Sequence, residues 1–134
     1  MAMTRVLLAD DYPQMLDKVT QLLRGEFDIV GSAHDGAQAL EAATRLNPDL
    51  LILDISMPIL SGIQVAARLR DSGCKAKVIF LTIHEDREYI DAAFAVGALG
   101  YILKSRVATD LLPAIYAVLQ GHRFSSPLQT VVLR

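Results

Sequence analysis

Five short apolar runs, each followed by a segment with helical spacing, constrain the fold of this 134-residue chain more than any other feature. The runs cover residues 6–9, 29–30, 50–53, 78–81 and 101–103. The first, third and fourth runs contain no alternating polar residues, which is typical of strands buried on both faces of a parallel sheet. We therefore predict a sheet with helices on both of its faces.

The segments between the apolar runs carry the spacing and end signals of helices. Leu16, Val19 and Leu23 recur on one helical face, and Pro13 lies near the first turn of that helix. Asp35, with Gln38 three residues later, predicts a capping box at the start of a second helix. The other expected end signals are Ser61 at the start of a third helix, Gly97 at the end of a fourth and Gly121 at the end of a fifth.

Five alternating strand and helix units predict an α/β fold with a parallel sheet. Right-handed crossovers favour a flavodoxin-like, doubly wound, five-stranded sheet of order 2-1-3-4-5 with five helices. We assign this domain to residues 4–120. Such sheets place their binding site at the carboxyl ends of the strands, beside the point where the strand order reverses.

The C-terminal part of the chain contains two prolines that bear on its helices. Pro113 has no backbone N–H, so we expect the fifth helix to begin near Thr109 or Asp110 and to keep this proline close to its first turn. Residues 125–127, Ser-Ser-Pro, are typical of a new helix start. The apolar residues that follow at helical spacing are Leu128, Val131 and Val132. We therefore expect residues 121–134 to be a linker or the start of a further helix.

Polar residues follow four of the five predicted strands. Asp10 and Asp11 come directly after the first strand, Asp54 after the third, Thr82 after the fourth and Lys104 after the fifth. An isolated Asp pair is more often a solvated turn or a helix cap than a site. Because these strands are contiguous in the predicted order, however, all five side chains are expected to converge at one edge of the sheet.

The charges of these residues favour a divalent cation. Three carboxylates in one pocket repel one another and raise their pKa values unless positive charge offsets them, and Lys104 supplies only one such charge. Oxygen ligands without His or Cys favour Mg²⁺ over zinc. A carboxylate such as Asp54 is also a competent nucleophile for a phosphoryl group, and a hydroxyl at Thr82 can donate to a phosphoryl oxygen.

With these residues in place, the chain resembles the receiver domains of two-component response regulators. The motifs that carry the resemblance are LADD at 8–11, LDISMP at 53–58, LT at 81–82 and GYILK at 100–104. The resemblance implies that Asp54 accepts a phosphoryl group from a sensor histidine kinase. It also implies Mg²⁺ ligands at Asp10, Asp11, Asp54 and the backbone carbonyl of Ser56, phosphoryl contacts from Thr82 and Lys104, and a coupled switch pair of Thr82 and Tyr101.

Three further segments, 28–33, 97–101 and 121–127, are similar to receivers that precede a LuxR-type helix-turn-helix domain. Ser105 stands where many receivers have proline, so a cis-proline at this point is not expected. The resemblance implies that phosphorylation controls a DNA-binding transcriptional output domain absent from this chain, either by dimerisation or by release of an occluded surface. The alternative is a stand-alone receiver that acts through protein contacts.

Composition argues against several other classes of protein. Thirteen basic and fifteen acidic residues give a net charge of −2, and no run of Lys or Arg favours direct nucleic-acid or membrane-surface binding. No apolar stretch approaches the roughly 20 residues of a membrane span. The single cysteine, Cys74, excludes a disulfide framework. We therefore expect a cytoplasmic protein.

Two enzymatic or ligand-binding alternatives fit the residues less well. A phosphatase with an aspartyl nucleophile would ordinarily have a second carboxylate two residues after it, where this chain has Ser56. A flavin or nucleotide module would bind phosphate after the first strand, where Asp10 and Asp11 would repel it. His84, two residues after Thr82, is interpreted as a loop residue, with a role in the lifetime of the phosphoryl group as the alternative.

Overall fold

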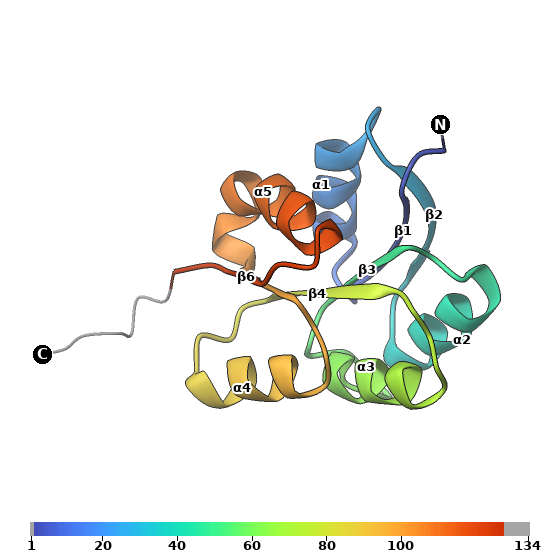
Figure 1. Ribbon diagram of the computed structural model, residues 1–134, viewed down its shortest axis with the longest axis vertical. Coiled ribbons are helices and arrows are strands. Elements are labelled where there is room, and N and C mark those ends of the chain that lie inside the picture. The colour runs from blue at the N-terminus through green and yellow to red at the C-terminus, as the bar shows by residue number, and fades with distance from the viewer. Residues whose placement is uncertain (1, 128–134) are drawn as a thin grey trace, which may run out of the picture.

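The computed structural model describes residues 2–127, which form one parallel sheet between two layers of helices (Figure 1). The strands lie in the order β2-β1-β3-β4-β5-β6, and every neighbouring pair is parallel. The predicted order 2-1-3-4-5 is therefore confirmed, with a sixth strand added at the β5 edge. The strands are β1 (Arg5–Ala9), β2 (Asp28–Ala33), β3 (Leu50–Leu53), β4 (Lys77–Thr82), β5 (Gly100–Leu103) and β6 (Phe124–Ser125).

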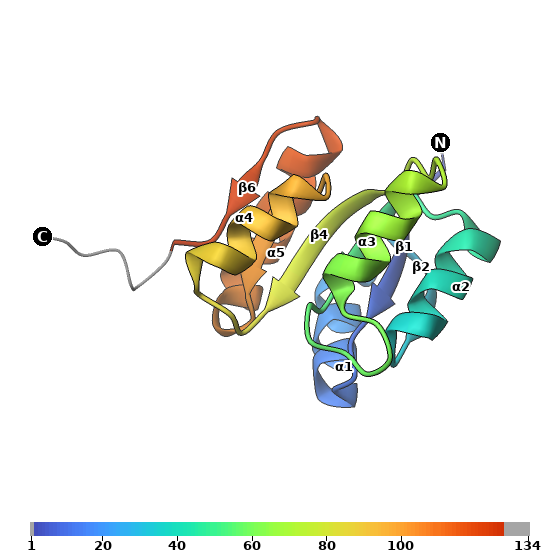
Figure 2. The ribbon, with the colours of Figure 1, turned by 90° about the horizontal axis from the view of Figure 1, so that it is seen from below.

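Within residues 2–127, five α-helices cover the two faces of the sheet, as predicted. The helices are α1 (Pro13–Leu23), α2 (Gly36–Leu46), α3 (Gly62–Asp71), α4 (Arg87–Ala95) and α5 (Val107–Leu119). Helices α1 and α5 pack on one face, and α2, α3 and α4 pack on the other (Figures 1 and 2). In the described part of the chain, no helix has the length and apolar character needed to cross a membrane.

Successive residues of each central strand enter opposite cores. Leu7 and Phe80 belong to the cluster under α2, α3 and α4, whereas Leu8 and Ile79 belong to the cluster under α1 and α5. All four side chains are almost completely buried. Burial on both faces explains why these strands are continuous apolar runs without polar alternation.

Most of the predicted helix ends are present. Pro13 is at the start of α1, and Gly97 follows the end of α4 with a φ of 96°, a left-handed conformation that favours glycine. Ser61 and Gln64 form a complete capping box at α3, with bonds of 2.9 and 3.1 Å. The box predicted at α2 is only half formed. Asp35 accepts from the N–H of Gln38, but the Gln38 side chain accepts from His34 instead of Asp35.

The predicted start of the fifth helix was wrong by two to three residues. Helix α5 begins at Val107 after a 3₁₀ turn over Lys104–Arg106, so Pro113 lies in the helix interior. Two interactions outweigh the backbone bond that the proline forgoes. Val107 is 1% exposed in the core, and Arg106 forms an ion pair of 2.8 Å with Asp110 one turn later.

The sequence did not predict a strand after α5. Phe124 and Ser125 form β6, which pairs with Gly100 and Tyr101 of β5. The half-buried Phe124 packs against the core of α1 and α5, and this burial favours a strand on the open β5 edge. The helix predicted to start at residues 125–127 stays a prediction, because it would continue beyond the described residues. The apolar stripe predicted at Leu128, Val131 and Val132 lies outside the described residues.

Candidate functional site

The site lies at the carboxyl ends of β1 and β3, beside the point where the strand order reverses. The N–H of Asp54 donates to the carbonyl of Ala9 at 2.9 Å, which fixes the residue after β3 against the end of β1. The N–H of Asp10 donates to the carbonyl of Ala33 at 3.0 Å. Backbone bonds from neighbouring strands thus position two of the predicted acidic residues.

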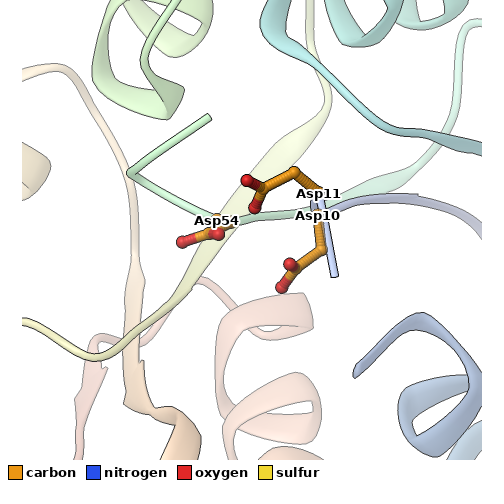
Figure 3. A group of neighbouring side chains, drawn as sticks. All are labelled: Asp10, Asp11 and Asp54. Carbon is orange, nitrogen blue, oxygen red and sulfur yellow. The ribbon is translucent and has the colours of Figure 1, made fainter. Parts of the chain in front are cut away.

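Three carboxylates converge here as predicted. One oxygen from each of Asp10, Asp11 and Asp54 lies within 4.8 Å of the other two (Figure 3). Asp10 and Asp54 are buried, whereas Asp11 is exposed. A cluster of hard oxygen donors with one side open to solvent suits a cation that keeps part of its water shell.

Lys104 reaches the same cluster from the end of β5. Its Nζ lies 3.1 Å from Asp54 Oδ2 and 2.9 Å from Asp10 Oδ2, and its side chain is only 9% exposed. The contact with Asp10 is an ion pair without hydrogen-bond geometry, so the buried Asp10 Oδ2 has no hydrogen-bond partner among residues 2–127. One ammonium against three carboxylates leaves an excess of about two negative charges, which a divalent cation would offset. The residues present therefore fit such a cation.

When no cation is bound, the pKa of Asp54 is raised from 3.8 to about 6. Burial is the largest cause and the charge of Asp10 is the second, while the charge and hydrogen bond of Lys104 oppose them. For Lys104, burial lowers the pKa, but its contacts with Asp10 and Asp54 outweigh that effect and raise it overall. Lys104 therefore remains an ammonium, and Asp54 is ionised above about pH 6.

Thr82 and Tyr101, the predicted switch pair, both bond to the backbone of His84. The hydroxyl of the fully buried Thr82 accepts from the His84 N–H at 3.1 Å. The Tyr101 hydroxyl donates to the His84 carbonyl at 2.7 Å. Burial and then the charge of Asp86 raise the pKa of Tyr101, which keeps this hydroxyl protonated as a donor.

The Tyr101 ring is fully buried, and its hydroxyl bond to the His84 carbonyl gives it a partner inside the fold. Its coupling to Thr82 on phosphorylation stays a prediction.

The His84 side chain has specific partners that sequence reasoning missed. Its Nε2 lies 2.7 Å from the Ser56 hydroxyl, and its ring stacks on Tyr89 at a centroid distance of 4.0 Å. One signal could have indicated the first contact. Ser56 lies two residues after Asp54, which follows β3, and His84 lies two residues after Thr82, which ends the neighbouring parallel strand β4.

The loop between β3 and α3 is held in one conformation by close backbone contacts. The Pro58 carbonyl accepts from Gly36 at 3.1 Å and from Leu60 at 2.9 Å, and Ile59 between them has a φ of 75°. A Cβ at Gly36 would collide with the Leu60 carbonyl, so only glycine permits this approach. Ser56, whose carbonyl is a predicted metal ligand, lies in this loop, and its N–H donates to Asp54 Oδ1 at 3.3 Å.

A doubly wound parallel sheet with three acidic residues, a lysine and a hydroxyl at the carboxyl ends of its strands is the arrangement expected of an α/β signalling domain. The chain belongs to the response regulator receiver domain family, which matches residues 6–116. The resemblance noted from the sequence is therefore confirmed.

Curated relatives cover nearly the whole chain. It is 40% identical over 127 residues to the uncharacterized transcriptional regulatory protein YvfU of Bacillus subtilis, covering 93% of this chain and 64% of that protein. It is 35% identical over 130 residues to the nitrate/nitrite response regulator protein NarL of Escherichia coli K12, covering 96% and 60%. The chain thus spans about 60% of the length of these relatives.

Solved structures share the fold. The signal receiver domain of the NarL response regulator from Mycobacterium tuberculosis has a TM-score of 0.86 at 32% identity, covering 91% of this chain and 100% of that one. A LuxR-family two-component response regulator from Aurantimonas sp. SI85-9A1 has a TM-score of 0.87 at 30% identity, covering 94% and 91%. The second supports the predicted LuxR-type subgroup.

Proposed function

We propose that Asp54 is the phosphoacceptor of this receiver domain. The observation that carries the proposal is its buried carboxylate, paired with Lys104 at 3.1 Å and within 4.8 Å of the oxygens of Asp10 and Asp11. A carboxylate held among charges of both signs can be both an ionised nucleophile and a cation ligand.

We further propose that Mg²⁺ is the cation, held by the carboxylates of Asp10, Asp11 and Asp54 and by the backbone carbonyl of Ser56. When bound, Mg²⁺ supplies positive charge that offsets the charge on the phosphoryl oxygens. The excess negative charge of the cluster, with three carboxylates against one ammonium, supports this assignment.

The residues of the chain then perform the transfer. An Asp54 oxygen forms the new bond to phosphorus as the bond to the leaving group breaks, and the leaving group departs with its electron pair. Lys104, already beside Asp54, stabilises charge on an equatorial oxygen. The Thr82 hydroxyl exchanges its bond from His84 for one to the phosphoryl group, which changes the loop that also holds Tyr101. Thr82 and Tyr101 are in this way a switch pair.

We propose that a sensor histidine kinase in the cytosol supplies the phosphoryl group and that the domain is a phosphoacceptor, not an enzyme. Ser56 supports the latter, because no second carboxylate stands two residues after Asp54. In this proposal, residues 4–120 are the receiver and residues 121–134 lead to an output domain that binds DNA, controlled by dimerisation or by release of an occluded surface. The regulatory names of the relatives and their greater length support this.

Intact-protein mass spectrometry after treatment with acetyl phosphate tests the phosphoacceptor. We expect the wild type to gain one phosphoryl group only with Mg²⁺, and Asp54→Asn to gain none, because its amide is not a nucleophile. The exposed Asp71→Asn is the matched control and should react like the wild type. A labelled Asp54→Asn protein would place the acceptor elsewhere.

The output part of the proposal has a separate test. The gene beyond the codon for Arg134 should continue into a helix-turn-helix domain. A stop codon at that point would leave the alternative, a stand-alone receiver that acts through protein contacts.

A further inference from the structure

The segment that leaves α5 is fixed to the domain by a buried polar cluster outside the phosphorylation site. Ser126 is 2% exposed and Asp110 is 5% exposed. The Ser126 hydroxyl donates to Asp110 Oδ2 at 2.7 Å and accepts from the N–H of Leu103 at 3.1 Å. Arg106 donates to both Asp110 oxygens, at 2.8 and 3.2 Å, so the carboxylate is fully paired.

The Ser126 hydroxyl performs a task that the backbone of β6 does not. In a parallel ladder that continued past Ser125, the N–H of Leu103 would donate to the next backbone carbonyl. The Ser126 side chain accepts from Leu103 in place of that carbonyl, while its own N–H donates to the Tyr101 carbonyl at 2.8 Å.

The cluster joins the exit segment, residues 122–127, to the residues around the switch. Tyr101 bonds at one end to the His84 carbonyl through its hydroxyl and at the other to Ser126 through its backbone. Leu103 directly precedes Lys104, which contacts Asp54. Arg123, in the same exit segment, lies over the ring of Phe94 on α4 at 4.6 Å. The segment therefore contacts α4, β5 and α5 together.

We propose that Ser126 and Asp110 are positioning residues that attach the outgoing chain to β5, so that the state of the switch determines how the chain leaves the domain. This inference rests on the proposed function for its coupling, but not for the attachment itself. A change in the contacts of Tyr101 reaches Ser126 through one backbone hydrogen bond. Asp110 in turn holds the serine hydroxyl against α5.

Hydrogen exchange of the whole 134-residue chain, measured by mass spectrometry in metal-free buffer, tests the attachment. Ser126→Ala should speed exchange of the amides of Leu103 and of residues 124–126 by about tenfold, since it removes a buried hydrogen-bond pair. Ser125→Ala is the matched control. Its hydroxyl is in an exposed residue and bonds only to the Ser126 carbonyl, so exchange should stay within about twofold of wild type. Wild-type protection in Ser126→Ala would overturn the attachment.

The same measurement with Mg²⁺ and acetyl phosphate tests the coupling. Phosphorylation should change exchange at residues 122–127 in the wild type and in Ser125→Ala, but not in Ser126→Ala, although all three label Asp54 at the same rate. If Asp54 is labelled but hydrogen exchange in the exit segment of the wild type does not change, the coupling is wrong and the proposed function stands. If Asp54 takes no label, the proposed function fails and the coupling fails with it, while the metal-free comparison still decides the attachment.

Discussion

At the scale of single residues, the site contains a carboxylate, Asp54, whose surroundings disfavour its charged form. Burial and the neighbouring Asp10 raise the pKa of Asp54 to about 6, so folding without metal carries a free-energy cost whenever this carboxylate is charged. The cost is part of what makes the pocket receptive to a cation. It also gives the metal-free protein a distinctive pH dependence.

Because the pKa of Asp54 is higher in the folded than in the unfolded state, the folded state binds the proton more tightly between pH 4 and 6. The contribution of this group to stability therefore falls as pH rises through that window. Asp54→Asn removes the effect. In EDTA, the free energy of unfolding of Asp54→Asn relative to the wild type should rise by up to about 3 kcal/mol from pH 4 to pH 6 and then level off. Urea unfolding at a series of pH values measures the difference, and a value independent of pH would contradict the assignment.

Asp11 offers a complementary prediction, because it is the exposed member of the cluster. Millimolar Mg²⁺ should raise the melting temperature of the wild type by a few degrees, since a ligand specific for the folded state stabilises it by about 1.4 kcal/mol at tenfold its Kd. Asp11→Asn should raise the metal-free stability slightly, by about 0.5 kcal/mol, and reduce the response to Mg²⁺. Thermal scans with and without Mg²⁺ compare the two proteins, with Asp71→Asn as control.

At the scale of helices and strands, the sequence predicted the elements that carry regular patterns. The five strand and helix units were predictable because doubly buried strands have no polar alternation and because helix ends use few residue types. Strand β6 could not be predicted, because two residues are too few to show a periodic pattern. The Ser-Ser-Pro sequence that begins within it has the composition of a helix cap. The early start of α5 was hidden by Pro113, whose preference for the first turn is outweighed by Val107 and the Arg106–Asp110 pair.

In the site, too, only residues tied to a regular pattern could be predicted. Asp10, Asp11, Asp54, Thr82 and Lys104 could be placed from the sequence, since each follows directly on a strand whose position in the sheet was predictable. The stacking of His84 on Tyr89 and its bond with Tyr101 could not be placed, because they depend on the path of a loop that no periodic pattern specifies.

The capping box of α3 allows a test at this scale. Ser61 and Gln64 satisfy two backbone donors at the start of the helix that follows the phosphoacceptor loop. Ser61→Ala should lower the free energy of unfolding by about 1 kcal/mol. The exposed Ser105→Ala should change it by less than about 0.5 kcal/mol. Urea denaturation compares the two, and equal stability would show that the box contributes nothing.

At the scale of the whole molecule, the charge of this chain does not favour direct binding to DNA. The net charge is −2, and basic residues form no run. Since non-specific DNA affinity comes from phosphate neutralisation, the 134-residue chain should show no binding to duplex DNA below about 10 μM protein at physiological salt. Fluorescence anisotropy with a labelled random duplex measures it. A salt-dependent rise at lower concentration would reveal a DNA surface on the receiver itself.

The fixed loop after Asp54 has a consequence for how the protein gains its cation. A flexible loop would lose conformational entropy on binding, at about 1–2 kcal/mol for each residue ordered. Here the turn at Ile59, and the approach of Pro58 and Leu60 to Gly36, order the loop beforehand, so the carbonyl of Ser56 is preorganised. Affinity for Mg²⁺ is thereby linked to a glycine outside the ligand set. Gly36→Ala should lower that affinity severalfold in a Mg²⁺ titration, while the exposed Ala37→Ser leaves it unchanged. Equal affinities would mean that the loop orders only when the cation arrives.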